Sequence, residues 1–306
     1  MALTLAEASK LSNDILLQGI VETIVKDSPI LRALPFVEIV GNGLTYNREN
    51  SLPSIDFYDV GDTWTESTPT FDQRTANLKI MGGDADVDNF LKSTRANIQD
   101  LEAAVIELKS KALKNKFEEN FVYGDSAVNA KQFDGLKKLI NTGASSAQVV
   151  AAGATGATLT LGMLDQLIDA IRGGRPDMLL MSRRSRRKVN SLIRAGGGMM
   201  ETNRDKWGNF IELWNGIPIG VSDWVLDTHA LTGGLETATT GGNSSTVYAL
   251  EFGEGALCGL TAPGYLTVEN VGSLETKDAT RTRIKWYVSL ALFSSVKAAA
   301  LIGVQD

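Results

Sequence analysis

The sequence predicts an α+β fold, and three observations lead to this prediction. Residues 93–122 repeat apolar side chains at helical spacing, whereas residues 281–293 alternate apolar and polar side chains as a strand does. The other expected elements are mixed and follow no regular strand–helix–strand alternation, which disfavours a doubly wound parallel sheet. At 306 residues, the chain is long enough for one large domain or two modest ones.

The N-terminal part predicts an arm followed by a long extended excursion. Residues 5–26 have the spacing of an amphipathic helix that ends before Pro29. Residues 41–81 carry short alternating runs broken by turn residues, which predicts two paired strands. An isolated hairpin is marginally stable in water, so this one is expected to lie on another molecule. The aromatic residues available for that contact are Phe57, Tyr58, Trp64 and Phe71.

The long helix predicted at 93–122 is the strongest helical pattern in the chain. Its apolar positions are Ile98, Leu101, Val105, Leu108, Ala112 and Phe117. The segment FDGLKKLIN follows at 133–141. Residues 142–158 are rich in Gly, Ala, Ser and Thr, which predicts a surface loop or a crossing between domains.

The second half predicts a series of shorter elements. A helix is expected over 161–171, and strands over 178–182, 214–225 (with a turn), 247–253, 265–271 and 281–293. In the last strand one face is apolar, and the other begins with Arg281, Arg283 and Lys285.

Composition limits the function classes. The chain is 43% hydrophobic and 22% charged, with a net charge of −6 and a pI near 5.1. This balance disfavours a protein whose whole surface binds phosphate backbones, and it suits a container around a polyanion better. The single Cys258 excludes an intrachain disulfide, and with the single His229 it leaves no common zinc cluster, so no metal or cofactor is expected. No secretory signal and no transmembrane run is found, so the expectation is a soluble protein made inside the cell, with no membrane partner.

Sequence templates for enzymes break when they are tested. The segment FGEGALCG (252–259) has Cys258 where a dinucleotide-binding loop needs its third glycine. The run Asp84, Asp86 and Asp88 resembles the start of a calcium loop but lacks the glycine and glutamate that follow, so these acids are expected at a strand end. His229 has no G-x-S-x-G elbow to serve and is expected at the surface. No catalytic residue is therefore predicted.

A cluster of basic residues opens the helix expected after the strand at 178–182. It comprises Arg183, Arg184, Arg186, Arg187 and Lys188. On a helical wheel Val189, Leu192 and Ile193 share one face, with the basic residues on the other face or its flank, and Ser182 is a good N-cap. Few aromatic residues are interleaved for base stacking. The cluster therefore favours a charged face that contacts water or acids of a neighbouring subunit over a specific nucleic-acid site.

The order of these features resembles the major capsid proteins of tailed bacteriophages, whose fold is named after phage Hong Kong 97. The resemblance rests on IMGGDADVDNFLKST at the start of the long helix, on F-x-G-L at Phe133, Gly135 and Leu136, and on the turn with Gly216 and Pro218 in NGIPIGVSD. The strand and helix of the family's axial domain resemble the segment DMLLMSRRSRRKVNSLI. The family's final peripheral strand resembles the segment RTRIKWYVSLALFSSVKAAALIGV.

The resemblance implies a division of the chain and a set of contacts. It implies an N-terminal arm (1–40), an extended loop (41–81), a peripheral domain (82–155 and 265–306) with a spine helix at 93–122, and an axial domain (156–264). Inter-subunit contacts are expected at Arg48, Phe57, Tyr58, Trp64, Phe71, Arg183, Arg184 and Arg187.

The implied function is a virion capsid protein that forms hexamers and pentamers and closes an icosahedral shell around phage double-stranded DNA. Assembly is expected in the host cytoplasm with portal, scaffolding and decoration proteins as partners, and with non-specific contact to the packaged DNA. Some family members cross-link subunits through a loop lysine, but no lysine lies between Lys26 and Lys79, so a non-covalent shell is expected. An encapsulin-like compartment around protein cargo is the first alternative. A nucleic-acid-binding regulator that uses the arginine cluster is the second, and an enzyme is the weakest.

Overall fold

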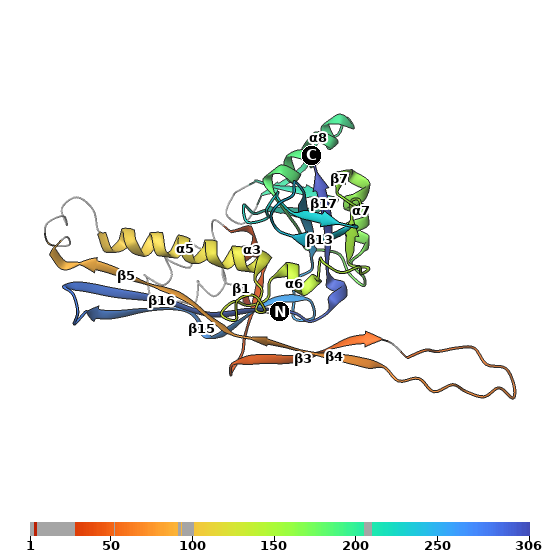
Figure 1. Cartoon of the computed structure of the whole chain (residues 1–306), viewed down its shortest axis with the longest axis horizontal. Helices are drawn as coiled ribbons and strands as arrows, with labels where there is room; N and C mark the ends of the chain where they lie inside the picture. The colour runs from red at the N-terminus through yellow and green to blue at the C-terminus, as the bar shows by residue number, and fades with distance from the viewer. Residues whose placement is uncertain (1–2, 5–27, 52, 91–92, 94–100, 205–209) are drawn as a thin grey trace.

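The computed structural model describes residues 3–4, 28–51, 53–90, 93, 101–204 and 210–306. Figure 1 shows an elongated molecule with three parts: a long sheet beneath one long helix, a second sheet with its own helices, and a hairpin that projects away from both. The amphipathic arm predicted at 5–26 lies outside the described residues. Within the described part, no helix combines the length and apolar character needed to span a bilayer.

The first sheet has the strand order β1-β2-β15-β16-β5. The bounds of its strands are Leu3–Thr4 (β1), Pro35–Glu38 (β2), Lys79–Asp88 (β5), Leu257–Ser273 (β15) and Ala279–Leu292 (β16). The short helix α3 (Pro29–Ala33), capped by Ser28, leads into β2. The alternation predicted at 281–293 is confirmed, because the side chains from Ile284 to Leu292 at every second position are buried in β16.

Helix α5 (Leu101–Tyr123) packs against this sheet, mainly on β5 and β16. Its C-terminal end agrees with the predicted helix, whereas the predicted start lies outside the described residues. The predicted apolar face was wrong in part, because Leu108 and Ala112 are exposed. The buried face follows Ile106, Leu113, Phe117 and Phe121 instead.

An aromatic cluster fills the space between α5 and the first sheet. The ring centroids of Phe117 and Trp286 are 5.0 Å apart, those of Phe36 and Trp286 5.5 Å, and those of Phe117 and Phe133 5.9 Å. All four rings are at most 4% exposed. Such contacts add to the stabilisation that burial of the rings already provides. The spine helix, the sheet and the segment at 133 therefore form one continuous core.

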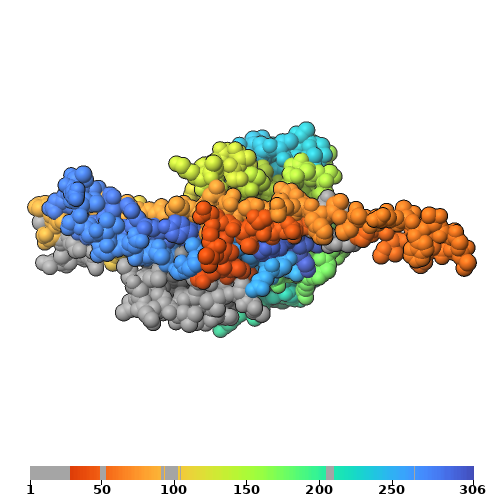
Figure 2. Space-filling view, turned by 90° about the horizontal axis from the view of Figure 1, so that it is seen from below, coloured from red at the N-terminus to blue at the C-terminus, as the bar shows by residue number. Residues whose placement is uncertain are grey.

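The extended excursion predicted at 41–81 is confirmed as a hairpin. Strands β3 (Gly43–Ser51) and β4 (Thr70–Asn77) pair antiparallel from Gly43–Asn77 to Ser51–Thr70. Residues 53–69 form the tip beyond this ladder. Figures 1 and 2 show the hairpin leaving the body of the molecule, so most of its surface faces solvent in one copy of the chain.

The second sheet has the strand order β6-β17-β14-β8-β11-β10-β9, with β7 also paired to β17. The bounds are Val149–Ala151 (β6), Ala157–Thr158 (β7), Met178–Met181 (β8), Glu201–Arg204 (β9), Phe210–Trp214 (β10), Ile217–Val221 (β11), Ser245–Leu250 (β14) and Ala298–Gln305 (β17). The predicted strand at 178–182 is confirmed. The loop predicted at 142–158 instead contributes the two short strands β6 and β7, both parallel to β17.

Three further helices are α6 (Leu136–Ile140), α7 (Leu161–Asp169) and α8 (Arg183–Ala195). The remaining elements are a small hairpin of β12 (Ala230–Thr232) and β13 (Leu235–Ala238) and the 3-10 turn Ser295–Lys297. Residues 298–305 pair with β14 in the second sheet, whereas residues 257–273 pair with β16 in the first. The domain boundaries implied by the resemblance stay a prediction.

Candidate functional site: the projecting hairpin, the basic helix and a buried polar relay

The tip of the projecting hairpin exposes large apolar side chains to solvent. Ile55, Phe57, Val60 and Trp64 are all exposed, and so is Phe71 at the start of β4. Tyr58 is half-buried because its ring stacks on Trp64, with the centroids 4.5 Å apart. A monomeric protein rarely exposes apolar side chains grouped in this way, so the tip is a candidate contact surface.

Arg48 lies on β3, near the middle of the hairpin's ladder, where it pairs with Asp72. Its guanidinium donates to the carbonyl oxygen of Leu292 and lies 5.8 Å from the centre of the Tyr46 ring. Tyr46 packs in turn on Phe293 with a centroid distance of 4.8 Å. Arg48 therefore ties the hairpin to the end of β16 in its own chain, and its predicted contact with another subunit is untested.

Helix α8 has the layout that the sequence predicts. Ser182 is the N-cap and accepts from the backbone N–H of Ser185, and Val189 and Ile193 are buried. Acids of the same chain meet the basic face. Arg183 makes a two-pronged ion pair with Asp223, and Arg187 lies 3.5 Å from the carboxylate of Asp306.

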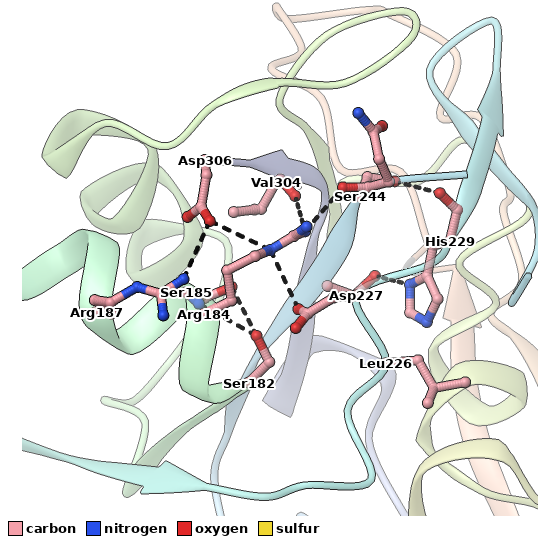
Figure 3. A network of polar contacts seen from close by, with 12 residues as sticks. Ser182, Arg184, Ser185, Arg187, Leu226, Asp227, His229, Ser244, Val304 and Asp306 are labelled. Atoms are coloured by element: carbon pink, nitrogen blue, oxygen red, sulfur yellow. Dashed lines mark hydrogen bonds and ion pairs between the residues drawn. The ribbon is translucent and has the colours of Figure 1, made fainter. Parts of the chain in front are cut away.

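Arg184 differs from its neighbours because it points inward (Figure 3). Its side chain is only 20% exposed, and Nη2 donates to the carbonyl oxygens of Asn243 at 2.9 Å and Val304 at 3.3 Å. Its Nε lies 3.5 Å from Oδ1 of Asp227. Arg184 thus joins α8 to the end of β17 and to the loop before β12, whereas Arg183 and Arg187 remain exposed. The contact predicted between these arginines and a neighbouring subunit is not tested.

His229 is buried, so its predicted surface position was wrong. Its ring nitrogens meet side chains of α5, β13 and β14, which come from distant parts of the chain. Nε2 lies 2.7 Å from the hydroxyl of Tyr123, and Nδ1 lies 2.9 Å from the hydroxyl of Thr246. Nδ1 also lies 3.5 Å from Oε1 of Glu236, which forms an ion pair at 2.9 Å with Lys137.

The direction of these hydrogen bonds follows from proton counting. Thr246 donates its only hydroxyl proton to Glu236 at 3.3 Å, so it must accept from Nδ1–H of His229. Nε2 of the neutral ring is then an acceptor and receives the hydroxyl proton of Tyr123, whose oxygen accepts from the backbone N–H of Leu226 at 2.8 Å. We call this series of hydrogen bonds, from Tyr123 through His229 and Thr246 to Glu236, the buried relay.

Burial determines the protonation state of the relay. It lowers the pKa of His229, although the nearby Glu236 opposes this shift. It likewise raises the pKa of Tyr123. The ring of His229 is therefore neutral near pH 7, and a second ring proton would leave the hydroxyl proton of Tyr123 without its acceptor.

Asp84 and Asp86 lie on β5 and pair with arginines directly opposite on β16. Arg283 donates two hydrogen bonds to Asp84, at 2.6 and 2.9 Å, and Arg281 donates two to Asp86, at 2.6 and 2.7 Å. The hydrogen bonds from Arg281 and then Lys277 hold the pKa of Asp86 well below its usual range. The acidic run lies at the end of β5, as predicted, and the structure adds that it forms a cross-strand charge ladder.

The F-x-G-L segment closes the C-terminal end of α5. Phe133 and Leu136 are buried, and Gly135 lies so close to the helix that a Cβ atom there would be 2.4 Å from the carbonyl oxygen of Asn120. The backbone N–H of Gly135 donates to the carbonyl oxygen of Gly124 at 2.8 Å. A side chain at position 135 would therefore force the segment off the helix.

Gly216 and Pro218 shape the hairpin between β10 and β11. Asn215 and Gly216 both have positive φ, at 49° and 72°, as an Asn-Gly two-residue turn requires. Pro218 pairs with Leu213 of β10, while the pairing of β11 with β8 begins one residue later. The missing N–H of Pro218 therefore removes no hydrogen bond from the sheet.

Cys258 is buried in β15, as its sequence context indicated. Burial raises the pKa of its thiol to about 12. It is an unreactive packing residue.

Comparison with known proteins agrees with this architecture. Residues 13–164 match the family model for major capsid protein GP7. No curated protein sequence matches the chain. Among solved structures, the SrpI encapsulin from Synechococcus elongatus PCC 7942 is similar with a TM-score of 0.67 at 18% identity, over 100% of this chain and 97% of that one. The capsid of a native GTA particle is similar with a TM-score of 0.63 at 14% identity, over 92% and 90%. The structure of Microbacterium phage Oxtober96 is similar with a TM-score of 0.61 at 14% identity, over 91% of each chain.

These likenesses, together with the projecting hairpin and the spine helix, show that the chain has the Hong Kong 97 capsid fold. Within that class, the family match is specific. The chain is similar over residues 13–164 to the major capsid protein family, and it is a capsid protein that forms the shell of the virion.

Proposed function

We propose that the protein assembles as hexamers and pentamers into an icosahedral shell that encloses phage double-stranded DNA. The match to the major capsid protein family is the observation that supports this proposal most directly. Its role is structural, without bond chemistry. Portal, scaffolding and decoration proteins are its further partners during assembly in the host cytoplasm, and its contact with DNA is non-specific.

The extended hairpin supports the same proposal on physical grounds. Its tip exposes Phe57 and Trp64, and the ladder between β3 and β4 carries it away from the core. Contacts between neighbouring copies would cover these side chains and spread many small burials over a large interface. If the hairpin of each copy contacts a different surface of the next copy, the contacts are head-to-tail. Such contacts form a closed ring only when the rotation between neighbouring subunits divides a full turn evenly, as in hexamers and pentamers.

Electron microscopy of the purified protein tests the proposal. Closed particles or hexameric rings are the expected result, and monomers under all salt and concentration conditions would contradict it. The observation that supports the encapsulin-like alternative is the similarity to the SrpI encapsulin, with a TM-score of 0.67. The content of particles taken from infected or producing cells distinguishes the two, since nuclease-protected DNA supports the phage shell and a protein cargo supports the alternative.

The chemistry between subunits gives a second test. Lys79, at the end of the extended loop (41–81), is the only lysine in that loop, so the rest of the loop lacks an amine that could form an isopeptide bond. Lys79 itself donates to the carbonyl oxygen of Ala130 at 2.7 Å. Assembled particles should therefore dissociate to single chains on a denaturing gel, and a ladder of covalent oligomers would contradict this expectation.

A further inference from the structure

A pocket of about 760 Å³ lies between the projecting hairpin and the body of the molecule. Its walls come from β3, β4, the start of β5, the segment that follows α5, helix α6 and β16. Its volume lies within the roughly 300–1,000 Å³ of ordinary binding pockets. We call it the basic pocket, because four cations and one carboxylate line it: Arg48, Arg74, Lys79, Lys138 and Asp134. In a chain whose net charge is −6, such a grouping attracts anions locally.

Two of the four cations have no carboxylate partner among the described side chains. The guanidinium of Arg48 donates to the carbonyl oxygen of Leu292 at 2.8 Å, and the ammonium of Lys79 donates to that of Ala130 at 2.7 Å. A carbonyl oxygen accepts a proton but carries no net charge, so the positive charge of each side chain stays uncompensated. Both cations can therefore still attract an anion.

The other two cations already have carboxylate partners. Arg74 pairs with Asp72 at 2.7 Å, but the two side chains are 59% and 44% exposed, and so exposed a pair contributes little. Lys138 pairs with Asp125 at 2.6 Å and with Asp134 at 3.0 Å. The Lys138 side of the pocket is therefore balanced, whereas Arg74 can exchange its partner for a new anion at small cost.

The spacing of the uncompensated charges indicates the size of the ligand. Arg48 meets the backbone of Leu292, and Lys79 lies opposite Val288 in the pairing of β5 with β16. These two positions on β16 are four residues apart, which is about 13 Å along a strand. The stretch of β16 between them forms part of the pocket wall. A ligand with negative charge at two points along this line uses both cations, whereas a single small anion uses one.

The neutral lining of the pocket favours phosphate over carboxylate as the anionic group. A phosphate group offers three strong acceptor oxygens, whereas a carboxylate offers two. Linked phosphates can therefore accept from neutral donors of the pocket as well as from its cations. The side-chain amides and hydroxyls that supply such donors are those of Gln73, Thr75, Asn77, Ser126 and Gln132.

We propose that the basic pocket binds an oligophosphate, a ligand with two or more linked phosphate groups, with its phosphates against Arg48, Arg74 and Lys79. The ligand lies away from Asp134, whose carboxylate would repel it. A free polyphosphate and the backbone of a nucleic-acid strand share this chemistry. Because Arg48 and Arg74 belong to the hairpin and Lys79 begins β5, the bound ligand joins the hairpin to the first sheet. The site goes beyond the proposed function, since a dispersed subunit already contains all of it.

Calorimetric titration of the dispersed full-length subunit tests the site. The probes are sodium tripolyphosphate and a short oligothymidylate, each at constant ionic strength. Saturable binding of one probe molecule per chain is the expected result. Either probe supports the site, and the preference between them identifies the source: tripolyphosphate alone indicates a free polyphosphate, and oligothymidylate alone indicates a nucleic-acid backbone. No saturable binding of either probe would overturn the proposal, whether or not the chain forms particles.

Two variants with the same change in net charge locate the site. Arg74→Gln with Lys79→Gln removes two cations from the pocket, and Lys111→Gln with Lys116→Gln removes two from the exposed face of α5. The pocket variant should bind the probe at least about tenfold more weakly, because it loses hydrogen bonds from charged donors. The α5 variant should bind within about twofold of the wild type, because salt screens distant surface charges. Equal weakening in both variants would overturn the site in favour of general charge attraction.

Chemical labelling of the unaltered protein gives an independent measurement. An acetylating reagent modifies accessible amines, and mass spectrometry follows each lysine with and without a saturating concentration of the probe that binds. Acetylation of Lys79 should slow severalfold in the complex, whereas Lys111 and Lys116 should react at unchanged rates. Unchanged acetylation of Lys79, or equal protection of the lysines on α5, would overturn the proposed position of the ligand.

Discussion

Replacing Glu236 with alanine should destabilise the subunit more than any exposed ion pair can. The Glu236 side chain has 0% exposure, and it meets Lys137 at 2.9 Å, Thr246 at 3.3 Å and His229 at 3.5 Å. Its removal leaves the ammonium of Lys137 without this partner and removes the acceptor at the end of the buried relay. Breaking one side of a buried ion pair costs about 3–5 kcal/mol. The lower end applies, because the Lys137 side chain is 26% exposed.

Calorimetry of dispersed subunits near pH 7 measures this effect. A loss of about 3 kcal/mol corresponds to a fall in Tm of roughly 6 °C or more for a domain of this size class. The matched control is Glu107→Ala, which removes an exposed pair with Lys111 at 2.7 Å and should cost at most about 0.5 kcal/mol. If Glu236→Ala is no more destabilised than this control, the buried relay does not hold the fold together.

A double variant separates the charge from the packing. Glu236→Met leaves Lys137 uncompensated, whereas Glu236→Met with Lys137→Met removes both charges. Replacing both partners of a buried pair by apolar side chains is often neutral. The double variant should therefore be more stable than the single one, and the opposite order would contradict the assignment of the cost to an unpaired charge.

Three further predictions concern the relay, the F-x-G-L segment and helix α8. Burial lowers the pKa of His229 below its unfolded value of 6.5, so the neutral ring stabilises the fold above pH 6.5 and this stability is lost as the pH falls below it. The variant His229→Gln should therefore lose roughly 1 kcal/mol less stability than the wild type between about pH 7 and 5.5, as measured by urea titrations. Parallel stability curves for the two proteins would contradict this. Gly135→Ala should cost at least about 2 kcal/mol, because its Cβ would lie 2.4 Å from a backbone oxygen, while Gly255→Ala, where nothing lies within 4 Å, should be nearly neutral in the same titration. Arg184→Ser should lower Tm by several degrees, whereas Arg187→Ser, whose side chain is 74% exposed, should not; equal shifts would refute the inward role of Arg184.

The arginine cluster shows how the structure sharpens a sequence pattern. The sequence predicts a helix with Val189 and Ile193 inward and a basic outer face, and the structure confirms both faces of α8. It adds that acids of the same chain already meet the outer face, at Asp223 for Arg183 and Asp306 for Arg187. Free positive charge for a polyanion is therefore smaller than the sequence count suggests.

Local rules determined much of this protein from its sequence. The alternation in β16, the N-cap at Ser182 and the turn at Gly216 depend on neighbours along the chain, so spacing alone predicts them. The long hairpin was also evident, because its polar and aromatic pattern is incompatible with a core. These features, in their order along the chain, were sufficient for the capsid resemblance.

Only the tertiary structure decided which polar residues are buried. The partner of His229 on α5 is 106 residues away, and its partner on β14 is 17 residues away. Nothing in the local sequence distinguishes this histidine from a surface one, because burial depends on which elements pack around it. The buried face of α5 likewise follows the position of Trp286 and the first sheet, rather than the best-spaced apolar residues of the helix. Periodicity specifies an element, and packing against distant elements specifies which side of it becomes the core.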